Sequence, residues 1–548
     1  MAMQRLGEEQ VKLREEHEAS LARHKAELDA SFTEKVQVTV VMEMNFATQA
    51  AGFSDLAIHI LAMTRKRKST AKAIEIGNKG KKIQQIQEMG PFISDLPKSV
   101  LQDVLTKLPI RSIIMCKRVC KAWYSLISDH EFAKLHLAQA EACPLVRPSA
   151  PTRVSRTVYL LELEEKSDFD LKDYVGDAGT SECIHFHLRM NFAKFKIPLR
   201  NADQAIHAMR NRKGSTKRKP CIKLEPLDHK YMYVNSCNGL LFLAETFYND
   251  PLVVCNPITG EFIQLPEASK DESRERLSIR CALGYSPKTN QYKVLRVFSQ
   301  GTPNLVRMVE LYTLGQSSWK SLGTAPTSAA YMLLTLPTYL NGELYWFYYE
   351  SSYEIASFDF DNEQFHSVPT PPFELEECQH VSLGLLGGSL CVCYAHENCI
   401  NVWVMEDYST QKSWTNRFSI KTDDGVWWPK GLYEPMRYLK NGGLLMFNHS
   451  TVTLIYYHPR NYRSLIYLKL RGFSPYFEAI SHVPSFISLK DILMGNDVEV
   501  LNINSRCAEC KLPGETRGLD LVNLDADVAS DDRSFKEFRM KQGFYRWQ

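Results

Sequence analysis

The sequence predicts a mixed multidomain fold, in which a short three-helix module precedes a larger all-β domain. Two observations lead to this prediction. Between residues 92 and 140, apolar residues recur with the period of an amphipathic helix. From about residue 155 to 490, short apolar runs alternate with turn residues, which is typical of many short strands. A chain of 548 residues, 44% of them hydrophobic, is long enough to fill the cores of both parts.

Three helices are expected in the segment 92–140. Pro97 suits the first turn of a helix, where its missing N–H costs nothing. Pro109 ends that helix, because it forces the preceding Leu108 out of the helical region. A module this small buries little surface by itself, so its surplus of apolar side chains predicts a partner-binding surface. The apolar stripe consists of Val100, Leu101, Val104, Leu105, Leu108, Ile113, Ile114, Val119, Trp123, Leu126 and Ile127.

Two recurring phrases organise the segment 155–490. The first is a glycine followed by an apolar strand, as in "NGLLFL" (238–243) and "NGELYWF" (341–347). Asn-Gly pairs favour tight turns with positive φ, so each phrase predicts a turn followed by a strand. The second phrase is a polar turn followed by an aromatic residue. These aromatic residues, at steps of 57, 46, 49 and 48 residues, are Phe262, Trp319, Phe365, Trp414 and Tyr462.

This spacing predicts a β-propeller. A repeat of about 50 residues with roughly four strands is the pattern of a propeller blade, which buries its faces only by stacking on neighbouring blades. Five phrases predict five blades, and the strand-like segments 156–164 and 183–190 predict a sixth. An open β-sandwich is the alternative. The sequence leaves the number of blades and the closure of the ring open.

The two ends of the chain differ from both domains. Residues 1–90 are predicted to form a charged helical and basic flexible extension, and residues 491–548 a disordered polar tail. The basic run "RKRK" (65–68) is either a nuclear import signal or part of a solvated linker. The formal net charge is only +3, and no long uncharged apolar run occurs, so we expect neither nucleic acid nor membrane as a partner. The expected location is the cytoplasm, the nucleus or both.

The helical module carries a spaced pattern that resembles the F-box. The pattern is "LPKSVLQDVLTKLP" (96–109) followed by "VCKAW" (119–123) and a final Leu-Ile pair. The resemblance implies that the module docks onto the Skp-family adaptor of a cullin–RING ubiquitin ligase. A three-helix bundle without this role is the alternative. The adaptor-binding residues that the resemblance implies are Leu96, Pro97, Val100, Leu101, Leu105, Leu108, Pro109, Val119, Cys120 and Trp123.

Residues 230–470 resemble the F-box-associated, kelch-like domain that follows the F-box in many plant proteins. The resemblance rests on phrases such as "VVCNPITGEFIQLP" (253–266) and "IASFDFDNEQFHSVP" (355–369). It implies a substrate-recognition subunit of an SCF-type ubiquitin ligase. Such a subunit reaches the cullin and RING subunits through the adaptor, and binds an unknown protein substrate for ubiquitination through the β domain. The alternatives are a propeller scaffold without a ligase role and a propeller hydrolase.

Motifs for catalysis or metal binding are missing from the sequence. There is no nucleophile elbow, zinc-protease motif or phosphate-binding glycine loop, so we expect neither enzymatic activity nor a cofactor. Cys507 and Cys510 have the spacing of half a zinc site, but no second pair lies nearby, and we expect no metal. Cys391 and Cys393 alternate along one predicted strand and are assigned to the core.

Substrate contacts are expected in the least patterned loops of the β domain. Two such segments are "SRERLSIR" (273–280) and "TDDGVWWPKGLYEPMRY" (422–438). Trp427 and Trp428 are adjacent, so on a strand they would point to opposite faces and at least one would be exposed. We predict this pair as a recognition anchor, with blade packing as the alternative. The identity of the substrate is not readable from the sequence.

Overall fold

The structure is a computed structural model of the 548-residue chain, and it contains two compact units. The first unit ends at Gln139 and the second begins at Ala140. Each unit is described by itself. The described residues are 98–150, 153–163, 190–199, 230–244, 252–266, 280–300, 306–330, 337–349, 353–372, 380–396, 399–407, 413–421, 431–439, 442–459, 466–468, 477–493 and 498–503.

The described part of the first unit, residues 98–139, contains the three predicted helices and one more. Its helices are α3 (Lys98–Thr106), α4 (Ile110–Cys116), α5 (Lys121–Ile127) and α6 (His130–Gln139). The sequence analysis missed α6, because only Phe132, Ala133 and His136 of this helix are buried, and its apolar face is short. Asp129 caps α6 by accepting a hydrogen bond from the backbone N–H of Glu131 at 3.2 Å. The carboxylate of Asp129 is therefore part of the helix boundary.

The end of α3 follows the proline rule. The helix ends at Thr106, and the backbone N–H of Leu108 donates to the carbonyl of Leu105 at 3.2 Å in a tightened last turn. Pro109 then has extended backbone, with φ −55° and ψ 145°, and begins α4 as its N-cap. The predicted reason for the helix end, the restriction on the residue before proline, agrees with this geometry. Pro97 lies outside the described residues.

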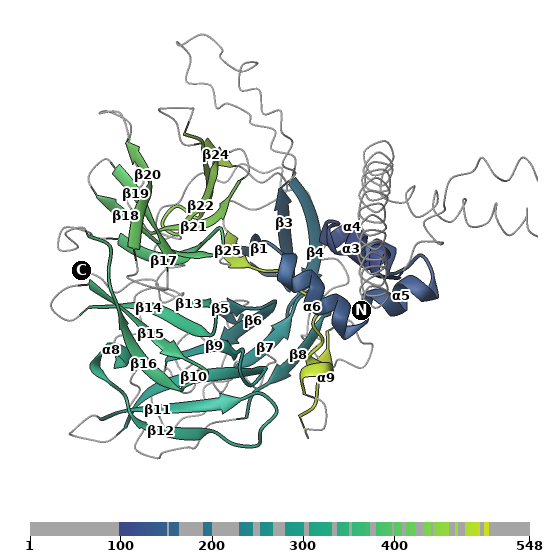
Figure 1. The fold of residues 1–548 in the computed structure, drawn as a ribbon, viewed down its shortest axis with the longest axis horizontal. Coiled ribbons are helices and arrows are strands. Elements are labelled where there is room, and N and C mark those ends of the chain that lie inside the picture. Colours follow the sequence, from purple (N-terminus) through teal and green to yellow (C-terminus); the bar gives the residue numbers. More distant parts are fainter. Residues whose placement is uncertain are drawn as a thin grey trace, which may run out of the picture. The chain divides into compact units, whose positions relative to one another are not determined.

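The second unit is a six-bladed β-propeller (Figure 1). From the innermost strand outward, its sheets are β25-β1-β3-β4, β5-β6-β7-β8, β9-β10-β11-β12, β13-β14-β15-β16, β17-β18-β19-β20 and β21-β22-β23-β24. The strands of the first two blades are β1 (Cys143–Ala150), β3 (Thr157–Leu163), β4 (Met190–Lys196), β25 (Phe477–His482), β5 (Met232–Cys237), β6 (Leu240–Ala244), β7 (Val253–Asn256) and β8 (Glu261–Gln264). Two short strands, β2 (Arg153–Val154) and β26 (Leu501–Asn502), pair with β1 and β8.

The other four blades follow in chain order. Their strands are β9 (Arg280–Ser286), β10 (Gln291–Gln300), β11 (Val306–Thr313), β12 (Lys320–Thr324), β13 (Thr338–Leu340), β14 (Glu343–Tyr349), β15 (Tyr353–Asp359), β16 (Gln364–Val368), β17 (His380–Leu386), β18 (Ser389–His396), β19 (Cys399–Asp407), β20 (Ser413–Lys421), β21 (Tyr433–Tyr438), β22 (Leu444–Asn448), β23 (Thr453–Tyr457) and β24 (Ile466–Leu468). Two short helices, α8 (Thr327–Ala330) and α9 (Leu489–Ile492), lie in connections.

The first blade closes the ring. Its innermost strand, β25, comes from the C-terminal part of the chain and pairs antiparallel with β1, with Leu145 opposite Ile480. β25 also contacts the innermost strands of the two flanking blades, β5 and β21. The ring is therefore a closed propeller rather than an open sandwich. A sixth blade is present, and β3 lies inside the predicted strand 156–164. The predicted strand 183–190 shares only Met190 with β4, and its residues 183–189 lie outside the described residues.

Two predicted domain limits differ from the structure. The propeller begins at β1, before the predicted limit at residue 155, because Pro144 and Pro148 hide this strand from a pattern of alternating residues. At the other end, α9 and β26 extend the ordered chain past residue 490, into the predicted polar tail. β26 is two residues long and half-buried, so it leaves almost no signal in the sequence. Residues 504–548 lie outside the described residues.

The two recurring phrases mark two positions in a blade. Asn238 and Gly239 have φ of 44° and 85°, and Asn341 and Gly342 have φ of 50° and 92°. Both residues of each pair have positive φ, as a type I′ hairpin requires, and these turns precede the second strands β6 and β14. The aromatic phrases lie at the outermost strands. The strands that the glycine phrases predicted are thus the second strands of their blades, and the aromatic phrases within the described residues fall at the fourth strands.

Two of the repeated aromatic residues tie neighbouring blades together. The indole N–H of Trp319 donates to the carbonyl of Pro266 at 3.1 Å, and that of Trp414 donates to the carbonyl of Pro369 at 2.8 Å. Each proline follows the outermost strand of the preceding blade, so the two contacts are equivalent. This shared contact accounts for the tryptophan at the same position of two repeats. Tyr462 lies outside the described residues.

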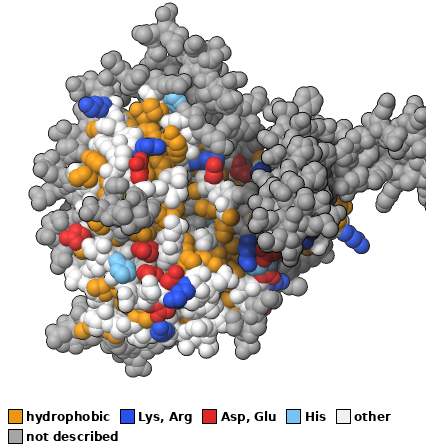
Figure 2. Space-filling view, viewed as in Figure 1, with side chains coloured by type: hydrophobic (Ala, Val, Ile, Leu, Met, Phe, Trp, Pro, Cys, Tyr) orange, Lys and Arg blue, Asp and Glu red, His pale blue; other side chains and the backbone are white. Residues whose placement is uncertain are grey.

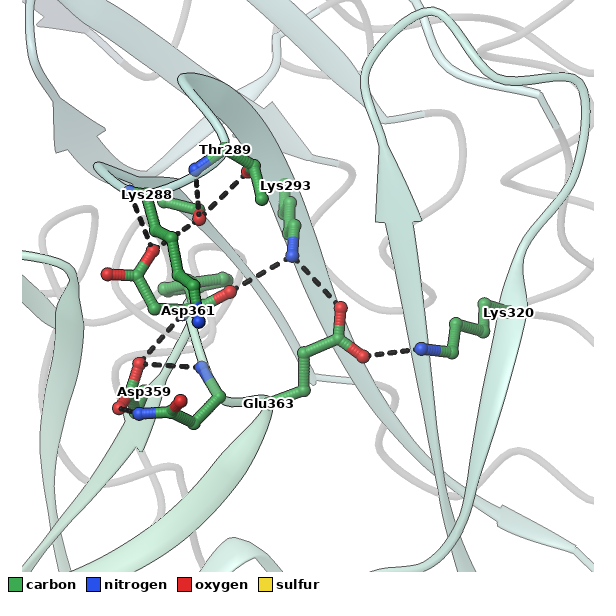
Figure 3. A network of polar contacts seen from close by, with 10 residues as sticks. Lys288, Thr289, Lys293, Lys320, Asp359, Asp361 and Glu363 are labelled. Atoms are coloured by element: carbon green, nitrogen blue, oxygen red, sulfur yellow. Dashed lines mark hydrogen bonds and ion pairs between the residues drawn. The ribbon is translucent and has the colours of Figure 1, made fainter.

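A polar network joins the third and fourth blades of the chain (Figure 3). Asp361, in the β15–β16 turn, accepts a hydrogen bond from the backbone N–H of Lys288 in the β9–β10 turn at 3.0 Å. Glu363 accepts from the ammonium groups of Lys293 at 2.9 Å and Lys320 at 2.5 Å. The Lys293 side chain is almost fully buried, so this carboxylate is a close partner that its ammonium group has in place of water. The network therefore links two adjacent blades on the side of the ring where the β9–β10 and β15–β16 turns lie.

Candidate partner-binding surfaces

The described F-box-like residues fall into a buried group and an accessible group. Leu105, Leu108 and Trp123 are buried, with exposed fractions of 0%, 7% and 6%. Their side chains pack in the interior of the helical unit. Leu96 and Pro97 lie outside the described residues. The accessible part of the predicted adaptor-binding surface therefore consists of the half-buried Val100, Leu101, Pro109 and Val119 and the exposed Cys120.

The beginning of α5 places core and surface side by side. Cys120 is the N-cap, and its sulfur accepts a hydrogen bond from the backbone N–H of Trp123 at 3.5 Å. Trp123 turns into the core, while Tyr124 beside it is 57% exposed. The ammonium group of Lys117 lies 5.1 Å from the centre of the Tyr124 ring. A cation and an aromatic ring therefore stand at the surface next to a buried tryptophan.

Titratable groups inside the helical unit are inert rather than reactive. Burial raises the pKa of the Cys116 thiol to about 12, and burial lowers the pKa of His136 to about 4. Both groups are therefore neutral near pH 7. A nucleophilic cysteine would need a lowered pKa, so Cys116 is a core residue.

In the propeller, the two predicted recognition segments belong to the same kind of connection. Residues 267–279 join the outermost strand β8 to the innermost strand β9, and residues 422–432 join β20 to β21. In an antiparallel four-stranded blade, connections of this kind all lie at one end of the ring, opposite the first and third turns of each blade. The last part of the second segment, residues 433–438, is β21 itself rather than a loop. Trp427 and Trp428 lie outside the described residues.

The chain just after this tryptophan pair is anchored tightly. The backbone N–H of His449 donates to the carbonyl of Leu432 at 2.9 Å, and the His449 ring lies 2.7 Å from the carboxylate of Glu434. Gly431 has φ 157°, and a Cβ there would lie 2.0 Å from the hydroxyl of Ser450. Only glycine fits this position. Sequence reasoning missed Glu434 and His449, because fifteen residues and two strands separate them.

A buried ion cluster lies where the ring closes. Arg147 donates to Glu478 through Nε at 3.0 Å and through Nη2 at 2.5 Å, and Lys230 donates to the other oxygen of the same carboxylate. The guanidinium carbon of Arg147 lies 4.4 Å from the centre of the Tyr233 ring. Burial alone would raise the pKa of Glu478, but the two cations outweigh it and lower the pKa to about 2. No local pattern indicates this cluster, because Arg147 and Glu478 are 331 residues apart.

The described residues contain no built site for a metal ion. No group of three or more His, Cys, Asp or Glu side chains within the described ranges could hold one. Cys391 and Cys393 lie in β18 with exposed fractions of 0% and 1%, and they belong to the core, as predicted. Cys507 and Cys510 lie outside the described residues. None of the helices in the described ranges has the length and apolar character needed to cross a bilayer.

Comparisons with known proteins agree with this architecture. An F-box domain family matches residues 93–135, and a family described as the F-box associated beta propeller domain matches residues 187–488, more than half of the chain. F-box protein At3g07870 of Arabidopsis thaliana is 23% identical over 72% of this chain and 92% of its own length. F-box/kelch-repeat protein At3g23880 of the same plant is 24% identical over 65% of this chain and 88% of its own length. The chain thus belongs to the family of proteins that carry an F-box followed by an F-box-associated β-propeller.

Proposed function

We propose that this protein is the substrate-recognition subunit of an SCF-type cullin–RING ubiquitin ligase. The observation that carries the proposal is the order of the two units, an F-box at residues 93–135 followed by a six-bladed propeller. The F-box docks a Skp-family adaptor, which links the chain to the cullin and RING subunits. The propeller binds a protein substrate for ubiquitination. The chain is not itself an enzyme in this proposal, and it acts in the cytoplasm, the nucleus or both.

Adaptor binding is tested at the accessible part of the predicted surface. We expect Val119→Asp to weaken binding of a Skp-family adaptor by the full-length chain at least tenfold, because a carboxylate would be desolvated against an apolar contact. Leu135→Asp is the matched control, since Leu135 is an apolar residue with 44% exposure on α6, outside the predicted surface. Binding is measured by titration calorimetry, with thermal unfolding to confirm that both variants fold.

Trp123→Ala complements this pair. A buried aromatic residue truncated to alanine costs about 3–5 kcal/mol, so this variant is expected to lose both the stability of the helical unit and the complex. If the wild-type chain binds no Skp-family adaptor, the ligase role is wrong. If it binds one and Val119→Asp binds equally well, the ligase role stands and the predicted surface is wrong.

Substrate binding is tested at the tryptophan pair. We expect the double variant Trp427→Ala, Trp428→Ala to retain less substrate in affinity purification, while its thermal unfolding and its adaptor binding match those of the wild-type chain. Aromatic anchors commonly contribute 2 kcal/mol or more to an interface, which corresponds to roughly a thirtyfold loss of affinity. The control is Trp414→Ala, which removes the hydrogen bond to Pro369 and is expected to lower stability rather than substrate capture. A fall in stability for the double variant would instead assign the pair to blade packing.

Two rival functions remain distinguishable. A propeller scaffold without a ligase role would bind its partners but no Skp-family adaptor. A propeller hydrolase would need a catalytic group at the loops of the ring, and the buried Cys391 and Cys393 do not supply one, because burial raises the pKa of both thiols. Neither alternative has an observation that favours it over the ligase role.

A further inference from the structure

The charges of the helical unit are unbalanced. Residues 98–139 contain seven Lys and Arg residues against three Asp and Glu residues, a net charge of +4, whereas the whole chain carries only +3. All three acidic residues are already paired with lysines. The pairs are Lys98–Asp129 at 3.3 Å, Lys107–Asp103 at 3.0 Å and Lys134–Glu131 at 3.4 Å.

The remaining four cations lie in one short stretch. They are Arg111, Lys117, Arg118 and Lys121, and no acidic residue occurs between residues 111 and 121. Arg118 and Lys121 are exposed, and neither forms an ion pair with any residue that the structure describes. The surplus charge is thus concentrated at the end of α4 and the beginning of α5.

This cationic stretch is continuous with the proposed adaptor-binding surface. Val119 and Cys120, two of its accessible residues, lie between Arg118 and Lys121 in the chain. Tyr124, one turn further along α5, is exposed and lies beneath the ammonium group of Lys117. Around the α4–α5 junction, the half-buried Val119 and the exposed Cys120 and Tyr124 therefore lie next to cations in the chain. Apolar centres surrounded by charged rims are the common anatomy of protein interfaces.

We propose that the partner surface that meets α4 and α5 is acidic, and that Arg118 and Lys121 guide its docking. This inference rests on the proposed adaptor role of the unit and adds the chemistry of the partner: carboxylates placed opposite the α4–α5 junction. Charged residues at the rim of an interface act mainly on the association rate, since they attract the partner before contact. Their effect falls as salt shortens the range of the field from about 30 Å at 0.01 M to about 3 Å at 1 M.

The test compares charge reversals in the full-length chain. Arg118→Glu and Lys121→Glu are measured for binding to a purified Skp-family adaptor, by surface plasmon resonance at low and at high salt. The matched control is Lys134→Glu, which changes the net charge by the same amount but lies on α6 and is already paired with Glu131. We expect each test variant to slow association about threefold to tenfold at low salt, and the double variant more, with the differences nearly gone at high salt. The control is expected to change association less than twofold.

Each other outcome has a distinct meaning. If the adaptor binds the wild-type chain but the rate is independent of salt, or the control slows association as much as the test variants, the acidic-partner inference is wrong and the ligase role stands. If the wild-type chain binds no adaptor at either salt, the ligase role fails and this inference fails with it. If the reversals weaken retention on a heparin column but leave adaptor association unchanged, the cations form a general polyanion surface, which also overturns the inference.

Discussion

Replacing Glu478 with alanine is expected to destabilise the propeller by about 3–5 kcal/mol, the cost of breaking a buried ion pair by removing one partner. Glu478 is the shared acceptor for Arg147 and Lys230, whose side chains are 1% and 4% exposed. Without the carboxylate, two buried cations would face each other and no anion would remain between them. The damage falls on β1 and β25, the strands that close the ring.

The control for this prediction separates charge from packing. The triple variant Arg147→Met, Lys230→Met, Glu478→Leu removes all three buried charges together and is expected to be far more stable than Glu478→Ala, because apolar replacement of a whole buried charge cluster is often neutral. Lys320→Ala is a second control, since Lys320 is the exposed end of the other ion network. All four proteins are compared by urea unfolding at pH 7. Equal stability of Glu478→Ala and Lys320→Ala would contradict the prediction.

The same carboxylate predicts a loss of stability in acid. The pKa of Glu478 is lowered from 4.5 to about 2, so the folded protein holds the charged form more strongly than the unfolded chain does. Its contribution is present above pH 4.5 and is lost as the pH falls toward 2. Burial lowers the pKa of Lys230 to about 8, which leaves this lysine protonated over the whole acid range. Glu478→Gln is therefore expected to show a flatter decline of unfolding free energy between pH 5 and pH 2 than the wild-type chain.

Much of this fold is readable from short-range patterns. Asn238-Gly239 and Asn341-Gly342 predict tight turns, because few residues other than Asn and Gly accept positive φ at both positions. Trp319 and Trp414 repeat, because each blade must be joined to the blade before it. These features depend on a few neighbouring residues, and a sequence records them directly. The two Leu-Pro pairs of the F-box can be recognised in the sequence for the same reason.

The closure of the ring could not be predicted in this way. It depends on β25 pairing with β1 and on Glu478 meeting Arg147, contacts that no local period encodes. β1 contains two prolines, and β26 is only two residues long, so neither strand has the usual pattern. The anchor between Glu434 and His449 was missed for the same reason. Local repeats therefore predicted the strands and turns within one blade. The closure of the ring depends on the long-range pairing of β25 with β1.

Ending the chain after His482 is expected to prevent the propeller from folding stably, although all strands of the six blades would be retained. The residues after β25, here called the C-terminal strap (described residues 483–493 and 498–503), run along the second blade. Asn256, fully buried, donates to the carbonyls of Ser485 at 2.9 Å and Ile487 at 2.7 Å. At the outer edge, Leu501 pairs with Phe262 of β8. The strap covers a blade edge that is otherwise open.

The energetic reason is that the strap carries core residues. Leu489 and Leu493 are 0% and 3% exposed and belong to an apolar cluster of the propeller, and each such side chain contributes about 1.5–3 kcal/mol by its burial. The backbone N–H of Leu489 also donates to Glu261 at 2.7 Å. Removing the strap would leave Glu261 and Asn256 without these partners, at about 1–3 kcal/mol for each unsatisfied group. These losses are comparable to the whole stability of a typical domain, about 5–15 kcal/mol.

Two chain lengths and one point variant test this account. A chain ending at Ile503 keeps the whole strap and is the reference protein, whereas a chain ending at His482 is expected to be insoluble or unfolded. Asn256→Ala keeps the strap but removes its hydrogen bonds, and is expected to cost about 2–4 kcal/mol. Asn416→Ala is the matched control, because Asn416 is exposed and donates a single bond to Asn401 at 3.2 Å. If the chain ending at His482 unfolds at the same urea concentration as the chain ending at Ile503, the strap is only a surface covering, and the ring is held by β25 alone.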